Sequence, residues 1–196
     1  LAFGEVLGTV KKEEYNEAVA ELQKLPEKME QFLAGESCEA IPKYASQYFN
    51  HNSVFFIGRN LAYALGLEGS LKLKEISYIH SEAYASGELK HGTITLIEDG
   101  TLVIALGTYA PLFDKAMSNV VEVKARGAEV LALATEPFKE KMAHTADSVI
   151  AVPETHPVVQ PSLGVVRLQL FAYYVALQRG CDIDKPRNLA KSVTVE

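Results

Sequence analysis

Ser53-Val-Phe-Phe-Ile57, followed by Gly58, and Leu102-Val-Ile-Ala-Leu106, followed by Gly107, are the two stretches that decide the fold class. Each is a short apolar run that ends at a glycine, as expected for a strand buried on both faces of a sheet. Further strands are expected over 129–134 and 148–152.

Helical periodicity separates these runs. Helices are expected over 11–35 (with a new first turn at Pro26), 38–49, 61–78, 112–126, 139–144 and 161–178. Strands that alternate with helices predict an α/β fold, with a central parallel sheet covered by helices on both faces and right-handed crossovers. Ligands of such sheets usually bind beyond the carboxyl ends of the strands.

Composition sets the remaining bounds. The length of 196 residues suits one α/β domain with extra elements, and the balance of 48% apolar and 22% charged residues is that of an ordinary globular protein. The net charge of −6, without a dense Lys/Arg stripe, argues against a nucleic-acid partner.

The apolar segment 165–178 is too short to cross a bilayer and carries Arg167. Cys38 and Cys181 lie far apart, so a reducing, cytoplasmic setting is expected.

The densest group of functional side chains lies between Leu67 and Gly92. Glu68, Lys72 and Glu75 are spaced by four and three residues, so a helix would place them on one face. A solvated stripe of weak salt bridges explains this pattern as well as a functional site does.

Residues 80–91 are interpreted as a functional loop. They contain His80, Glu82, Glu88, Lys90 and His91, and Gly87 and Gly92 permit tight bends at its end. The spacing of the two histidines matches no zinc signature, so no metal is expected.

The C-terminal segment 184–196 has two interpretations. It is either a frayed terminus with solvated Arg187 and Lys191, or a docked tail that brings a lysine into a dry pocket, where its amine becomes a nucleophile. Phosphate is usually held by a Ser/Thr-rich loop that runs into a helix N-terminus. The loops that follow Gly58 and Gly107 lack this composition, so this chain alone is expected to grip a sugar phosphate poorly.

Residues 67–92 and the segment Pro186-Arg-Asn-Leu-Ala-Lys-Ser-Val-Thr-Val-Glu196 resemble the C-terminal end of the glutamine:fructose-6-phosphate aminotransferases, also called glucosamine-6-phosphate synthases. The resemblance implies the second of two sugar-isomerase (SIS) subdomains, a three-layer α/β sandwich. It divides the chain into a helical lead-in from the preceding subdomain (1–36), an SIS α/β subdomain (37–180) and a catalytic C-terminal tail (181–196). The start at Leu1 rather than Met agrees with a fragment that lacks the glutaminase domain and the first SIS subdomain.

The resemblance also implies the chemistry. Lys191 would form a Schiff base with the carbonyl of fructose 6-phosphate, and Glu75 would move a proton between C1 and C2 to give glucosamine 6-phosphate. His91 would assist ring opening in the site of the neighbouring subunit of a homodimer. Arg187 would stabilise developing negative charge, and Lys72 would support the cluster. No cofactor and no metal are implied.

Three other functions stay open from the residues. The chain could be a phosphosugar-binding SIS module with a regulatory role, a self-contained phosphosugar isomerase, or a dimerisation core. A sensor needs no lysine-bearing tail, and an independent isomerase needs its own phosphate loop. Both features therefore favour the isomerase half of an amidotransferase, which is expected to be inactive when isolated.

Overall fold

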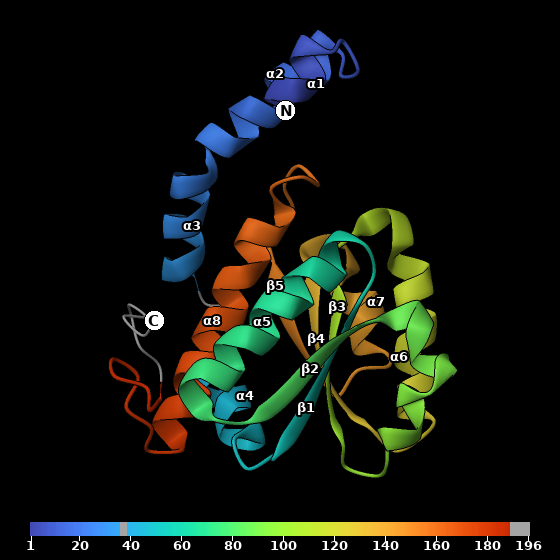
Figure 1. Ribbon diagram of the computed structural model, residues 1–196, viewed down its shortest axis with the longest axis vertical. Helices are drawn as coiled ribbons and strands as arrows, with labels where there is room; N and C mark the ends of the chain where they lie inside the picture. Colours follow the sequence, from blue (N-terminus) through green and yellow to red (C-terminus); the bar gives the residue numbers. More distant parts are fainter. Residues whose placement is uncertain (36–38, 189–196) are drawn as a thin grey trace, which may run out of the picture.

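The computed structural model of the chain describes residues 1–35 and 39–188, and its centre is a parallel sheet (Figure 1). The sheet has five strands in the order β2-β1-β3-β4-β5, and every neighbouring pair is parallel. Its strands are β1 Ser53–Gly58, β2 His80–Ala85, β3 Leu102–Gly107, β4 Glu129–Thr135 and β5 Ser148–Val152. The α/β class and the four strands read from apolar runs are confirmed.

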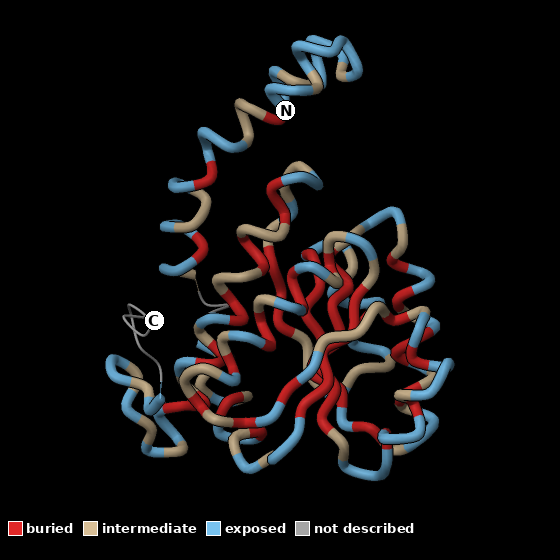
Figure 2. Tube along the Cα trace, in the orientation of Figure 1, coloured by how far each residue is buried: buried red, intermediate tan, exposed pale blue. Residues whose placement is uncertain are grey.

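Helices cover both faces of the sheet. One face carries α4 (Ala40–Tyr48), α5 (Leu61–Ser77) and α8 (Gln160–Gln178), and the other carries α6 (Phe113–Lys124) and α7 (Lys139–Ala143). Alternate residues of each strand enter two separate cores; Phe56, for example, packs under α5 and α8, while Phe55 packs on the α6 side. The buried residues accordingly concentrate around the strands (Figure 2).

The path of α5 decides where the charged side chains lie. Because β1 and β2 are parallel neighbours, α5 must start at the carboxyl end of β1 and return to the amino end of the sheet, where β2 begins at His80. The last residue of β1 must be a glycine for α5 to begin so close to the strand, because a Cβ on Gly58 would lie 2.6 Å from the backbone of Ala62. The second half of α5 therefore lies toward the amino ends of the strands.

The interpretation of 80–91 as a loop is wrong for its first half. Residues 80–85 form the edge strand β2, and 3₁₀ turns η2 (Ser86–His91) and η3 (Thr93–Leu96) follow. Ser81 is buried, whereas His80 and Glu82 are exposed. An edge strand with such polar residues lacks the apolar run that revealed the central strands.

Three helices precede the sheet: α1 (Ala2–Val6), α2 (Lys12–Gln23) and α3 (Leu25–Ala34), with Pro26 in the first turn of α3 as expected. They extend away from the sheet (Figure 1). Glu21 ties them to the segment before α8, since its carboxylate accepts a hydrogen bond from Thr155 at 2.8 Å. Hydrogen bonds from Lys28, Thr155 and Lys24 lower the pKa of Glu21 to about 2.

A second contact joins the lead-in helices to the body. The guanidinium of Arg167, in α8, lies 3.5 Å from the centre of the Phe32 ring in α3. Arg167 is fully buried, and Phe32 is nearly so. Within residues 1–35 and 39–188, no helix is both long and apolar enough to cross a bilayer.

Candidate active site

The charged face of α5 forms as its spacing predicts. Lys72 Nζ lies 2.8 Å from Glu75 Oε2 and 3.5 Å from Glu68 Oε1. The helix presents these three side chains outward because Leu65, Gly69 and Leu73 turn its other side to the core. Glu75 is the less exposed of the two carboxylates, at 25% against 43% for Glu68. The three side chains of the cluster are therefore partly buried, and Glu75 is the least exposed of them.

Glu75 also affects the titration of its neighbour. Its hydrogen bond raises the pKa of Lys72 above the ordinary value, although partial burial of Lys72 opposes the rise. Lys72 is thus a cation at neutral pH, and it donates a hydrogen bond to the Glu75 carboxylate at 2.8 Å. A carboxylate held beside a cation on a rigid helix is suited to proton transfer if a substrate reaches its free oxygen.

The first part of the C-terminal tail contacts the end of this same helix. Cys181 Sγ lies 3.9 Å from the carbonyl oxygen of Ser77, the last residue of α5. The backbone N–H of Arg187 donates to the Tyr78 hydroxyl at 2.9 Å, and the Arg187 guanidinium lies 4.2 Å from the centre of the Tyr78 ring. Residues 181–188 therefore contact Ser77 and Tyr78, where α5 ends, whereas Lys191 lies outside the described residues.

His91 lies elsewhere. It ends η2, beyond the carboxyl end of β2, and its side chain is exposed together with those of Glu88 and Lys90. Glu75 lies near the opposite ends of the strands, because α5 runs back along the sheet. One copy of the chain thus pairs Glu75 with Lys72 near the end of α5, places Arg187 against Tyr78 just beyond that helix, and leaves His91 at the other end of the sheet.

The loop between β1 and α5 makes polar contacts of its own. Arg59 donates through Nε and Nη2 to Asn119 Oδ1, at 3.1 and 2.8 Å, so its guanidinium is engaged within the fold. Asn60, just before α5, has a positive φ of 53°. That the loops after Gly58 and Gly107 hold phosphate poorly stays a prediction.

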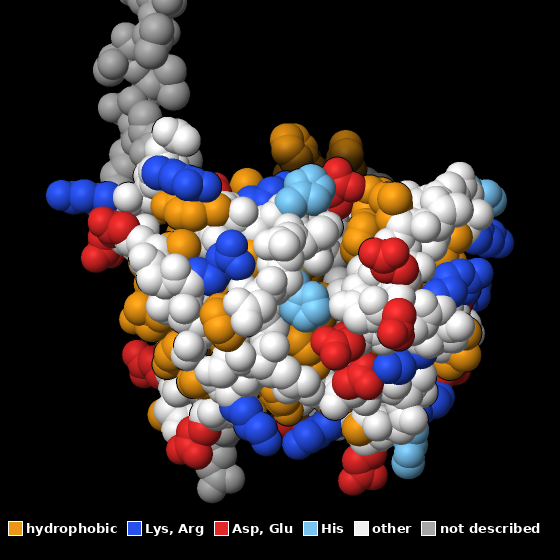
Figure 3. All heavy atoms as spheres, turned by 90° about the horizontal axis from the view of Figure 1, so that it is seen from below, with side chains coloured by type: hydrophobic (Ala, Val, Ile, Leu, Met, Phe, Trp, Pro, Cys, Tyr) orange, Lys and Arg blue, Asp and Glu red, His pale blue; other side chains and the backbone are white. Residues whose placement is uncertain are grey.

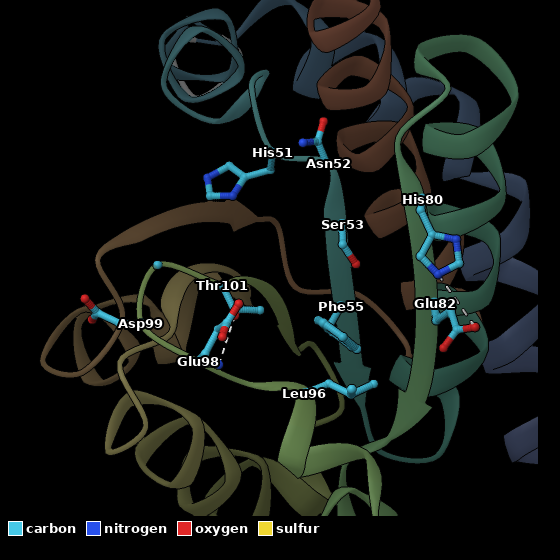
Figure 4. Close-up of a pocket in the computed structure, with 11 residues that line it drawn as sticks. His51, Asn52, Ser53, Phe55, His80, Glu82, Leu96, Glu98, Asp99 and Thr101 are labelled. Carbon is cyan, nitrogen blue, oxygen red and sulfur yellow. Dashed lines mark hydrogen bonds and ion pairs between the residues drawn. The ribbon is translucent and has the colours of Figure 1, made fainter.

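A hollow of about 370 Å³ lies at the amino end of the sheet (Figure 4). His51, His80, Glu82, Glu98, Asp99 and Thr101 are among its lining residues. The space-filling view from this end of the molecule shows histidine side chains close to acidic ones (Figure 3). Because Glu82 pairs with Phe55, which packs on the α6 side, the hollow opens on the face opposite to α5. It is therefore separate from the Glu75 cluster.

Within this hollow, His80 Nε2 lies 3.8 Å from Glu82 Oε1, and Glu82 also accepts a hydrogen bond from Tyr84. Over the described part of the chain, no group of three or more His, Cys, Asp or Glu side chains is arranged to hold a metal ion. The histidines of the 80–91 segment thus end up apart, one beside the hollow and one in η2.

Tyr78 is the contact residue that the sequence did not reveal. It partners Arg187 across 109 positions. Its only local signal is the abrupt change from helix to strand without a glycine, which requires a left-handed residue at that place. The bend at Tyr78 could have been expected from this signal, but the contact of Tyr78 with Arg187 could not.

A parallel α/β sandwich with a charged helix and a docked C-terminal segment belongs to a recognised class. The family model of the SIS domain matches residues 47–179, and the chain belongs to this family.

More specific relatives lie within that class. Over all 196 residues the chain is 54% identical to a glutamine–fructose-6-phosphate aminotransferase (isomerizing) from Clostridium acetobutylicum, and it covers 32% of that protein. A Thermus thermophilus protein of the same name is 46% identical over 99% of the chain, again with 32% of its own length covered. The chain thus spans about a third of these curated relatives.

A solved structure supports the same placement. The C-terminal domain of a glucosamine-fructose-6-phosphate aminotransferase from Francisella tularensis superposes with a TM-score of 0.85 at 31% identity. The match covers 94% of this chain and 51% of that one. The resemblance stated from the residues is thereby confirmed, together with the expected SIS architecture.

Proposed function

We propose that this chain is the second SIS subdomain of an enzyme that makes glucosamine 6-phosphate from fructose 6-phosphate and ammonia derived from glutamine. The observation that carries this proposal is the docking of the tail at the end of α5 that bears Glu75 and Lys72. A sugar-binding sensor would have no need of a lysine-bearing tail beside a carboxylate. Identity along the whole chain to aminotransferases of that name supports the same conclusion.

In the proposed reaction, the Lys191 amine attacks C2 of the open-chain ketose, and water leaves as the Schiff base forms. Ammonia then displaces the lysine to give the C2 imine. The Glu75 carboxylate removes a proton from C1 and returns it at C2, which leaves an amine at C2 and an aldehyde at C1. Lys72 holds Glu75 in place, and Arg187 stabilises negative charge that develops on the sugar.

His91 is assigned to ring opening in the neighbouring subunit of a homodimer. The position of His91 at the opposite end of the sheet from Glu75 supports this assignment, because a histidine so placed would serve a site completed by another copy. The division into lead-in (1–36), subdomain (37–180) and tail (181–196) belongs to the same proposal. So do a cytoplasmic location, the absence of a cofactor, and phosphate binding by a preceding subdomain.

An assay of glucosamine 6-phosphate formation tests this proposal. The longer protein that contains this chain should convert fructose 6-phosphate and glutamine to the amino sugar, and the 196-residue chain alone should show negligible turnover. Robust product formation by the isolated chain would refute the assignment of phosphate binding and ammonia supply to other domains. No product from the longer protein would refute the function itself.

A further inference from the structure

Tyr78 is the residue at which α5 gives way to β2. Its backbone is left-handed, with φ 62° and ψ 16°, and its N–H donates to the Lys74 carbonyl at 3.2 Å. A bulky side chain rarely adopts this conformation, since its Cβ is crowded there. Gly or Asn would cap the helix with less strain, so the tyrosine side chain must offer something that they lack.

What the side chain offers is a double contact with the C-terminal segment. The hydroxyl accepts the Arg187 N–H at 2.9 Å, and the ring lies under the Arg187 guanidinium at 4.2 Å. The two contacts use the backbone and the side chain of the same partner. They fix the direction in which the chain leaves Arg187 as well as its position.

We propose that Tyr78 is a positioning residue that anchors the tail at the Glu75 end of α5, so that Lys191 starts from a fixed point. The role of Lys191 in this inference rests on the proposed function. Tyr78 follows Glu75 by three residues, and Lys191 follows Arg187 by four, which is at most about 14 Å of extended chain. Anchoring raises the effective concentration of the amine near the carboxylate.

Limited proteolysis of the longer protein tests the anchor independently of catalysis. Trypsin does not cut Lys185–Pro186, so its first sites in the tail are Arg187 and Lys191. Tyr78→Phe keeps the ring and loses the hydroxyl, and loss of one such hydrogen bond should speed release of residues 188–196 about five-fold. Tyr78→Leu, which also loses the ring, should speed it further.

Tyr173→Phe is the matched control, because Tyr173 is an exposed tyrosine of α8 whose ring contacts that of Tyr174. Its tail should be released at the wild-type rate. Melting temperatures of all variants show whether the fold is intact, and the conservative Tyr78→Phe keeps the test valid if Tyr78→Leu fails to fold. Release at the wild-type rate in Tyr78→Phe and in any folded Tyr78→Leu would overturn the anchor.

The link to Lys191 is tested by trapping with borohydride in the presence of fructose 6-phosphate. Both Tyr78 variants should form the Lys191 adduct several-fold more slowly and lose kcat, while KM for fructose 6-phosphate stays near the wild-type value. A uniform loss of folded protein would not slow the formation of the Lys191 adduct by the protein that remains folded. Trapping at the wild-type rate in both would refute the positioning role; absence of any adduct in the wild type would instead refute the proposed function, and proteolysis would still judge the anchor.

Discussion

Lys72 lies between two carboxylates on α5, and the two are not equivalent. Glu75 is closer to its ammonium and less exposed than Glu68. Partly exposed ion pairs contribute at most about 1 kcal/mol to folding, so the pairing has little weight in stability. The arrangement matters more for placing one carboxylate oxygen rigidly beside a fixed positive charge.

Replacing Glu75 by Gln in the longer protein tests this view. The amide keeps the size but cannot carry the proton between C1 and C2, so glucosamine 6-phosphate formation should fall roughly 10²- to 10⁴-fold. Binding of fructose 6-phosphate and the melting temperature should change little. Glu68→Gln, on the same face of the same helix, is the matched control and should retain most of the activity. Unchanged turnover in Glu75→Gln would exclude the proton-transfer role.

The element that carries this site is held in place by an unusually close contact between two helices. A Cβ on Gly164 of α8 would lie 2.6 Å from Leu65 Cδ2 of α5, and one on Gly69 of α5 would lie 2.5 Å from Leu168 Cδ1 of α8. Glycine on each helix lets a leucine of the other approach its backbone. The position of Glu75 relative to the tail, which follows α8, depends on this packing.

Gly164→Ala is expected to destabilise the chain by roughly 1–3 kcal/mol, because the added methyl group must displace a buried leucine. The measurement is the midpoint of denaturant unfolding. Gly87→Ala is the control, since the nearest neighbour of its added Cβ is Arg59 Nη1, at 3.3 Å, and this atom would have to shift by only a few tenths of an ångström. Equal stability of Gly164→Ala and the wild type would contradict the close packing of α5 on α8.

Some elements of the fold and site could be predicted from the sequence, and others could not. The central strands were predictable because burial on both faces leaves continuous apolar runs such as 102–106. The shared face of Glu68, Lys72 and Glu75 followed from helical spacing alone. The edge strand β2 was missed because its outer residues are polar, and the contact of Arg187 with Tyr78 was out of reach because it joins distant positions.

At the scale of the whole molecule, the residues proposed for the site lie toward two opposite ends of the sheet. The Glu75–Lys72 ion pair and the contact of Arg187 with Tyr78 lie near the amino ends of the strands, and His91 lies beyond the carboxyl end of β2. The lead-in helices extend outward and are tied back by Glu21 with Thr155 and by Phe32 with Arg167. The curated relatives are about three times as long as this chain.

The most direct test of the account is to trap the covalent intermediate in the longer protein. Incubation with fructose 6-phosphate and borohydride, followed by mass spectrometry of the C-terminal peptide, should place the reduced sugar on Lys191. Lys191→Arg should abolish this adduct, because its guanidinium keeps the charge but is no nucleophile. A sugar adduct on another lysine, or no adduct in an active enzyme, would contradict the meeting of the tail amine with the Glu75 helix.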